Sequence, residues 1–258
     1  MLNRIIKTPA PSVGLVIGSY GVPAYMHLQL VSWKRFYPTI PLLIHDDSSD
    51  ACDQIAELCK AYGASFCKTE KREGHLEGDL SASIRGLEFG RDRELDIMVK
   101  FSRTWVPISN FVPTLQRLAY ETQYATYGNQ CKSNGYRLRT ECIGWHISTY
   151  FEGGHLDDMR DWLHRRCQAG DYMELYLHRV ATKVVERSTC IANIQYRARE
   201  ILDHECRYYG IWDWMSENSQ EPNGNWLWHR SDLPLDYHRL SQIYGLPYTL
   251  EDFENRPY

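Results

Sequence analysis

The chain has 258 residues, 43% hydrophobic and 24% charged, which fits a globular protein large enough for one α/β domain. Its formal net charge of −4 gives no support for a nucleic-acid or membrane-surface binder. We expect neither a signal peptide nor a membrane span, because the apolar run at residues 13–17 is too short. Eight cysteines without a CxxC pair argue against structural zinc and favour reduced thiols in the cytoplasm.

Residues 13–122 alternate between short apolar runs, typical of buried strands, and segments with helical spacing. The expected strands are residues 13–18, 42–44, 64–67 and 96–101, and the expected helices are residues 23–36, 51–62, 78–90 and 110–122. Gly63 is expected to end the second helix, and Ser48, Ser49 and Asp50 are candidates to cap its start. This alternation predicts the α/β class, with a mostly parallel central sheet flanked by helices on both faces.

Three of the expected strands end in polar residues. Ser19 follows the first strand, Asp46 and Asp47 end the second, and Ser102 follows the fourth. Right-handed crossovers bring the carboxyl ends of parallel strands to one edge, where open α/β sheets bind their ligands. The sequence therefore predicts a polar site along this edge.

The pattern changes after residue 128. Residues 136–147 can form strands, and residues 155–167 and 172–187 have helical spacing. Residues 211–258 are rich in Trp, Tyr, Pro, Asn and Asp, which indicates an irregular, aromatic-rich tail. We expect one catalytic domain over residues 1–210, with residues 211–258 packed on the same domain.

Residues 12–185 resemble the family 2 glycosyltransferases, whose Rossmann-like GT-A fold binds nucleotide sugars. The resemblance rests on Ser19-Tyr20-Gly21 after the first strand, on the turn His45-Asp46-Asp47-Ser48-Ser49-Asp50, and on the glycine-then-arginine helix at residues 78–90. It implies a UDP-, GDP- or TDP-sugar donor, a glycan or lipid-linked acceptor, and inverting transfer of a hexosyl or related sugar. It implies no nucleic-acid partner. A cytoplasmic location is expected, with peripheral membrane contact if the acceptor is lipid-linked.

The same resemblance implies roles for residues at the sheet edge. Ser19 and Tyr20 would lie against the base, and Asp46 or Asp47 would accept hydrogen bonds from the base or ribose. Arg85 would lie near the diphosphate, where its fork of donors suits phosphate oxygens. The alternatives are an ordinary strand-end turn at residues 19–20 and a solvated arginine on a helix face at Arg85.

The chain departs from the family at the end of the fourth strand. Relatives place Asp-x-Asp there to hold Mg²⁺ or Mn²⁺, whereas this chain has Ser102-Arg103-Thr104, which offers no carboxylate. Either Arg103 neutralises the leaving diphosphate instead of a metal, or other carboxylates bind the metal, or the protein binds a ligand without catalysis. We favour the first hypothesis, in which Ser102 and Thr104 would contact the donor or acceptor.

An inverting transferase also needs a base for the acceptor hydroxyl. Asp171 lies at about the position where the family places an acid, although it could equally cap the helix at residues 172–187. Asp157-Asp158 is a second candidate, whose position better suits the first turn of a helix. In the tail, Trp228 could stack on a sugar and His229 could contact a phosphate or metal, or both could be structural.

Three other functions fit the sequence less well. A nucleotidyltransferase of the same architecture would carry a glycine-rich basic loop after the first strand, which residues 19–23 lack. A dinucleotide-dependent oxidoreductase would have GxGxxG there. A degenerate nucleotide- or carbohydrate-binding protein remains compatible with the missing Asp-x-Asp.

Overall fold

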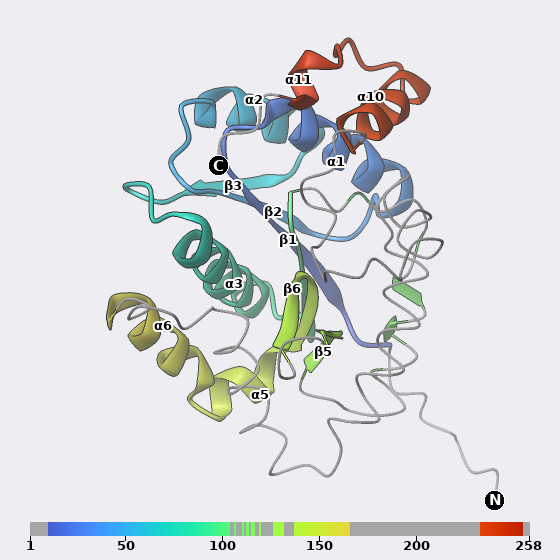
Figure 1. Cartoon of the computed structure of the whole chain (residues 1–258). Helices are drawn as coiled ribbons and strands as arrows, with labels where there is room; N and C mark the ends of the chain where they lie inside the picture. Colours follow the sequence, from blue (N-terminus) through green and yellow to red (C-terminus); the bar gives the residue numbers. More distant parts are fainter. Residues whose placement is uncertain are drawn as a thin grey trace, which may run out of the picture.

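The computed structural model describes residues 10–103, 126–131, 137–165 and 233–254, with single positions between residues 106 and 119. Its six-stranded sheet has the order β3-β2-β1-β4-β6-β5 (Figure 1). Strands β1 to β4 run parallel to one another, whereas β6 runs antiparallel to both of its neighbours, β4 and β5. The strands are β1 (Val13–Ser19), β2 (Leu42–Asp46), β3 (Ser65–Lys68), β4 (Ile97–Phe101), β5 (Thr126–Cys131) and β6 (Arg137–His146). The predicted α/β class with a mostly parallel sheet is confirmed.

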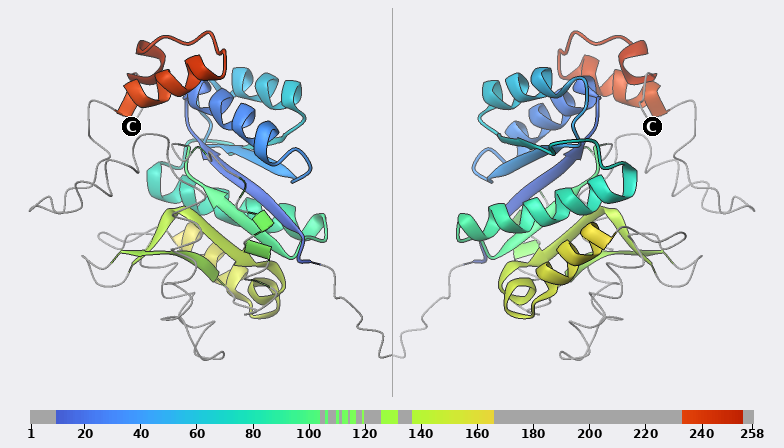
Figure 2. Two further views of the ribbon diagram at one scale, coloured as in Figure 1. Left: turned by 90° about the vertical axis from the view of Figure 1, so that its right-hand side faces the viewer. Right: turned by 90° about the vertical axis from the view of Figure 1, so that its left-hand side faces the viewer.

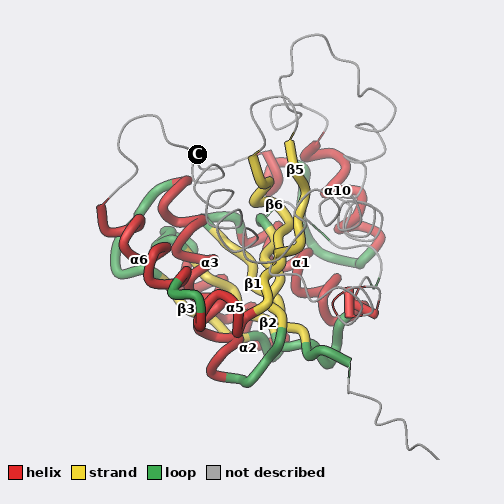
Figure 3. Tube along the Cα trace, turned by 90° about the horizontal axis from the view of Figure 1, so that it is seen from below, coloured by secondary structure: helices red, strands yellow, loops and turns green. Residues whose placement is uncertain are grey.

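Helices cover both faces of this sheet (Figures 2 and 3). One face carries α1 (Pro23–Phe36), α2 (Cys52–Tyr62), α10 (Leu233–Ile243) and α11 (Glu251–Glu254), and the other carries α3 (His75–Asp92), α5 (Ile147–Glu152) and α6 (His155–Arg165). Alternate strand residues pack into the two cores, with Leu15 and Ile17 facing α1 and Val16 facing α3. A sheet buried on both faces needs the continuous apolar strands seen in the sequence.

Glycines allow α3 to pack closely on the sheet. Gly78, Gly86 and Gly90 are spaced by multiples of four and share one face of the helix. A Cβ atom at Gly86 would lie 2.5 Å from Val16 Cγ1, and one at Gly78 would lie 2.9 Å from Asp47 Cγ. The first turns of α3 therefore lie directly beside the end of β2.

The C-terminal helices α10 and α11 pack on α1 (Figure 1). The ring of Tyr25 contacts those of Tyr237 and Phe253 at centroid distances of 4.7 and 5.1 Å, and its hydroxyl donates to Phe253 O at 3.2 Å. Tyr237 and Leu240 bury one face of α10. Residues 233–254 are thus more regular than the expected tail; the rest of that tail, residues 211–232 and 255–258, lies outside the described residues.

Most local predictions for the first hundred residues are confirmed. α1 spans the expected residues, and Gly63 ends α2 in the left-handed conformation at φ 75°. The predicted side-chain cap of α2 is wrong, because no side-chain hydrogen bond caps this helix and Ser49 donates instead to Asp46. The expected helix at residues 172–187 lies outside the described residues. Among the described helices, none combines the length and apolar character needed to cross a bilayer.

Candidate functional site at the carboxyl edge of the sheet

The polar ends of β1, β2 and β4 lie at one edge of the sheet, as predicted. Ser19 is the register partner of Asp46, and Ile17 is the partner of Phe101, which places Ser102 and Arg103 level with the end of β1. The backbone N–H of Asp47 donates to Ser19 O at 3.0 Å, so the turns after β1 and β2 are directly joined. The edge therefore brings together Tyr20 and Arg103, which are 83 positions apart in the chain.

Asp46 is fully buried and shapes its own turn. Its Oδ1 accepts from Ser49 N at 2.7 Å, and its Oδ2 accepts from the Ser49 hydroxyl at 3.1 Å. A carboxylate offers about four acceptor positions, so these two bonds occupy part of its capacity. A contact from Asp46 to a base or ribose stays a prediction.

Asp47 holds the loop that connects β3 to α3. Its Oδ1 accepts from Glu73 N at 2.8 Å and from the Thr69 hydroxyl at 3.2 Å, and its Oδ2 accepts from Gly74 N at 2.9 Å. The Ser48 hydroxyl donates to Thr69 O in the same loop. The Asp-Asp-Ser-Ser turn thus fixes the backbone at both ends of the segment that contains residues 70–72.

Two arginine side chains contact Tyr20. The guanidinium group of Arg72 lies over its ring, with Cζ 4.2 Å from the centroid. Arg103 donates from Nη1 to the carbonyl oxygen of Tyr20 at 3.4 Å. The sequence predicted a role for Arg103 and none for Arg72. A usable signal was present, because Lys71-Arg72 follows a parallel strand whose carboxyl end lies at this edge.

Gln29 of α1 fixes the turn that follows β4. The side-chain amide of Gln29 donates to the carbonyl oxygens of Ser102 and Arg103 at 3.3 and 3.2 Å, which holds this turn against α1. Ser102 and Arg103 supply no carboxylate for Mg²⁺ or Mn²⁺. Within the described part of the chain, no group of three or more His, Cys, Asp or Glu side chains is placed to hold a metal ion.

A buried ion pair joins β4 to α3 just below this edge. Lys100 is fully buried, and its ammonium group pairs with Oδ1 of Asp79. Among the described atoms, Oδ2 of Asp79 is buried without a hydrogen-bond partner. Removing one member of such a pair leaves an uncompensated buried charge, so the two residues constrain each other strongly.

His45 lies on the same face of the sheet as this ion pair. Burial, with the charge of Arg85 adding to the effect, lowers the pKa of His45 to about 4, so its ring is neutral at pH 7. Nδ1 lies 3.5 Å from Cys67 Sγ. Among the described atoms, Nε2 of His45 and the hydroxyl of Ser19 are buried without a hydrogen-bond partner. Burial also raises the pKa of Glu73, whereas a hydrogen bond from Ser81 opposes this shift.

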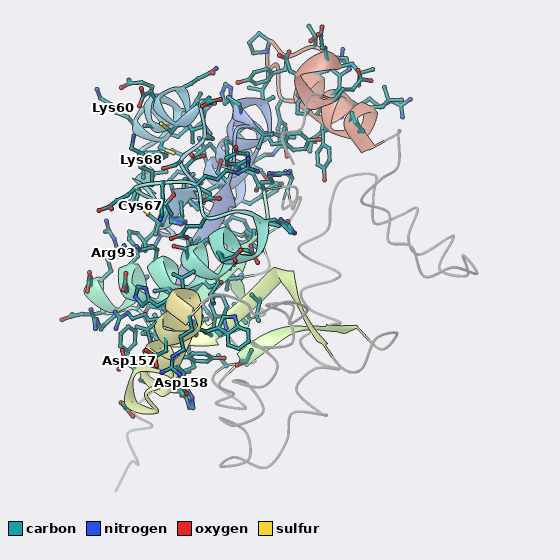
Figure 4. The ribbon with its side chains drawn as sticks, turned by 60° about the vertical axis from the view of Figure 1, so that its left-hand side comes forward. Lys60, Cys67, Lys68, Arg93, Asp157 and Asp158 are labelled. Atoms are coloured by element: carbon teal, nitrogen blue, oxygen red, sulfur yellow. The ribbon has the colours of Figure 1, made fainter. Side chains whose placement is uncertain are left out.

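Of the remaining predicted residues, the structure describes Arg85, Asp157 and Asp158. Arg85 is about two turns along α3 from Asp79, half exposed, and pairs with Glu88 at 2.9 Å. Asp157 and Asp158 lie in the first turn of α6, where Asp157 pairs with Arg160 at 2.7 Å (Figure 4). Thr104, Asp171, Trp228 and His229 lie outside the described residues, and their roles stay predictions.

Comparisons with known proteins gave structural matches only. No protein-family model and no curated protein matches the chain. The chain is similar to a mannosyltransferase from Pyrobaculum calidifontis in complex with GDP-Man and Mn²⁺, at 11% identity and a TM-score of 0.44, covering 57% of this chain and 48% of that one. It is also similar to TarS from S. aureus, at 12% identity and a TM-score of 0.42, covering 55% of this chain and 29% of TarS. A cytidylyltransferase from Leptospira borgpetersenii is similar at 15% identity and a TM-score of 0.40, covering 69% of this chain and 72% of that one.

Proposed function

We propose that the chain transfers a sugar from a nucleotide-sugar donor to a hydroxyl group of a glycan or lipid-linked acceptor. The observation that carries this proposal is the contact of Arg103 with Tyr20 at the edge where β1, β2 and β4 end. An aromatic residue suited to a base and a cation suited to a diphosphate thus lie next to each other. Parallel α/β sheets bind their ligands at this edge.

In the proposed reaction, the acceptor oxygen forms a bond to the anomeric carbon while the bond from that carbon to the diphosphate oxygen breaks. The electron pair leaves with the diphosphate, and the acceptor proton passes to Asp171 as the base. Arg103 stabilises the negative charge that develops on the leaving oxygen. Ser19, Tyr20 and either Asp46 or Asp47 would contact the nucleoside, and Arg85 would lie near the diphosphate. Ser102, Thr104, Trp228 and His229 would contact the donor or acceptor.

The first test measures thermal unfolding with UDP-, GDP- and TDP-sugars in the presence of EDTA or Mn²⁺. A donor at 100 times its Kd stabilises the folded state by about 2.7 kcal/mol, which raises the Tm. We expect one donor series to do so, and expect slow hydrolysis of that donor. The absence of a response to every nucleotide sugar would contradict the proposal. Stabilisation without turnover across an acceptor screen would favour a nucleotide-binding protein without transferase activity.

The second test is Arg103→Ala. Loss of a group that stabilises transition-state charge should lower kcat by about 10²–10³, with a much smaller rise in donor Kd. Arg93→Ala is the control, because Arg93 lies over Phe89 and donates to Ser65 at the other end of β3, with the same loss of charge (Figure 4). An unchanged rate in Arg103→Ala would rule out this role.

A further inference from the structure

Two loops place guanidinium groups on the same residue at the sheet edge. Arg72, from the loop between β3 and α3, stacks on the ring of Tyr20 at 4.2 Å. Arg103, from the turn after β4, donates to the carbonyl of Tyr20 at 3.4 Å. The two guanidinium groups therefore lie at one residue, and each carries a fixed fork of N–H donors. This geometry suits bonds to an anion beside Tyr20.

The Arg72 loop is positioned by the turn after β2. Asp47 binds the backbone N–H groups of Glu73 and Gly74, the two residues that directly follow Arg72, at 2.8 and 2.9 Å. Side-chain hydroxyl bonds at Thr69 fix the start of the loop. A backbone held in this way lowers the entropy lost when Arg72 binds a ligand. Asp47 is therefore a positioning residue for Arg72.

We propose that Arg72 and Arg103 together bind the diphosphate of the ligand, in the role that a divalent cation has in transferases with Asp-x-Asp. This inference rests on the proposed function and adds a second cation, from a different loop, to the site. Each phosphate of a diphosphate bridge carries a negative charge, and each arginine is a permanent cation that can donate two parallel hydrogen bonds. The end of β4 offers no carboxylate to hold a divalent metal, so the two arginines would supply the positive charge that neutralises the diphosphate.

The test compares ligands that share a nucleoside and differ in phosphate number. Calorimetry in EDTA measures the affinity of wild type for the nucleoside, its monophosphate, its diphosphate and inorganic pyrophosphate. The base is the one whose sugar donor raises the Tm. We expect the diphosphate to bind at least tenfold more tightly than the nucleoside, and we expect measurable binding of pyrophosphate.

In Arg72→Ala, the diphosphate should lose about 10- to 100-fold in affinity, as expected for hydrogen bonds to a charged group, while the nucleoside keeps its affinity. Arg72→Lys should recover part of the loss, because it keeps the charge and not the fork. Arg93→Ala should leave the affinity for all four ligands unchanged, since it removes an arginine that also lies over an aromatic ring, but at the other end of the sheet.

Three outcomes overturn the inference. An equal loss for nucleoside and diphosphate in Arg72→Ala would assign Arg72 to the base through Tyr20. A requirement for Mn²⁺ in wild-type diphosphate binding would mean that the two arginines do not replace a metal. Pyrophosphate affinity that does not change in Arg72→Ala would remove Arg72 from the anion site. If nucleosides and nucleotides all fail to bind while pyrophosphate binds through Arg72, the anion site stands and the proposed donor is wrong.

Discussion

The two faces of the sheet are built differently. The face under α1 is sealed by aromatic and aliphatic side chains, among them Tyr25, Tyr237 and Phe253. The face under α3 buries charge and polar atoms, including the Lys100–Asp79 pair and the neutral ring of His45. Buried polar groups lower stability unless they are fully paired. Polar side chains are buried on both sides, since Gln29 and Ser32 of α1 are also fully buried, but the buried ion pair among the described residues lies on the α3 face.

The comparison predicts its largest effect at the buried ion pair. Asp79→Leu removes the carboxylate that pairs with the buried ammonium group of Lys100 and should lower the free energy of unfolding by about 3–5 kcal/mol. Lys100→Met combined with Asp79→Leu removes both charges and should recover most of that loss. Urea denaturation of the two single variants and the double variant measures the coupling. Additive losses would show that the two side chains do not depend on each other.

The sequence predicted those parts of the fold that depend on patterns among neighbouring residues. The apolar runs of β1, β2 and β4 and the glycine after α2 follow from periodicity and backbone preference, and the parallel order follows from the β-α alternation. The partners of side chains were harder to predict from the sequence. Ser49 can either cap a helix or bind Asp46, and only the folded structure decides between these two hydrogen bonds. Arg72 was missed for the same reason, since its contact with Tyr20 joins loops that are 52 residues apart in the sequence numbering.

His45 should make the stability of the α3 face depend on pH. The unfolded chain takes up a proton near pH 6.5, whereas the folded chain does so only near pH 4, because the ring is buried. The free energy of unfolding should therefore be highest above pH 6.5 and fall by up to about 3 kcal/mol as the pH drops to 4. Denaturation at intervals from pH 7.5 to 4 measures this slope. In His45→Gln, whose new side chain cannot titrate, the free energy of unfolding should change less between pH 7.5 and 4. A slope equal to that of wild type would assign the pH dependence to other groups.

The close packing of α3 should give the smallest of these effects. In Gly86→Ala the new methyl group would lie 2.5 Å from Val16 Cγ1, so the helix or the strand must shift. Such overpacking costs about 1–3 kcal/mol, partly offset by the better helix propensity of alanine. Gly18→Ala, on β1, is the control for adding a methyl group between the sheet and α3, because its Cβ would lie 3.4 Å from Ala82 Cβ, an ordinary contact.

A double variant tests the cause. Val16→Ala removes the methyl groups that collide with residue 86, so adding it to Gly86→Ala should destabilise the protein less than Val16→Ala does in wild type. Urea denaturation of the four proteins provides this cycle. Independent losses at the two positions would mean that α3 reaches the sheet through other contacts. In that case Gly86 would not be the residue that allows α3 to lie close to Val16.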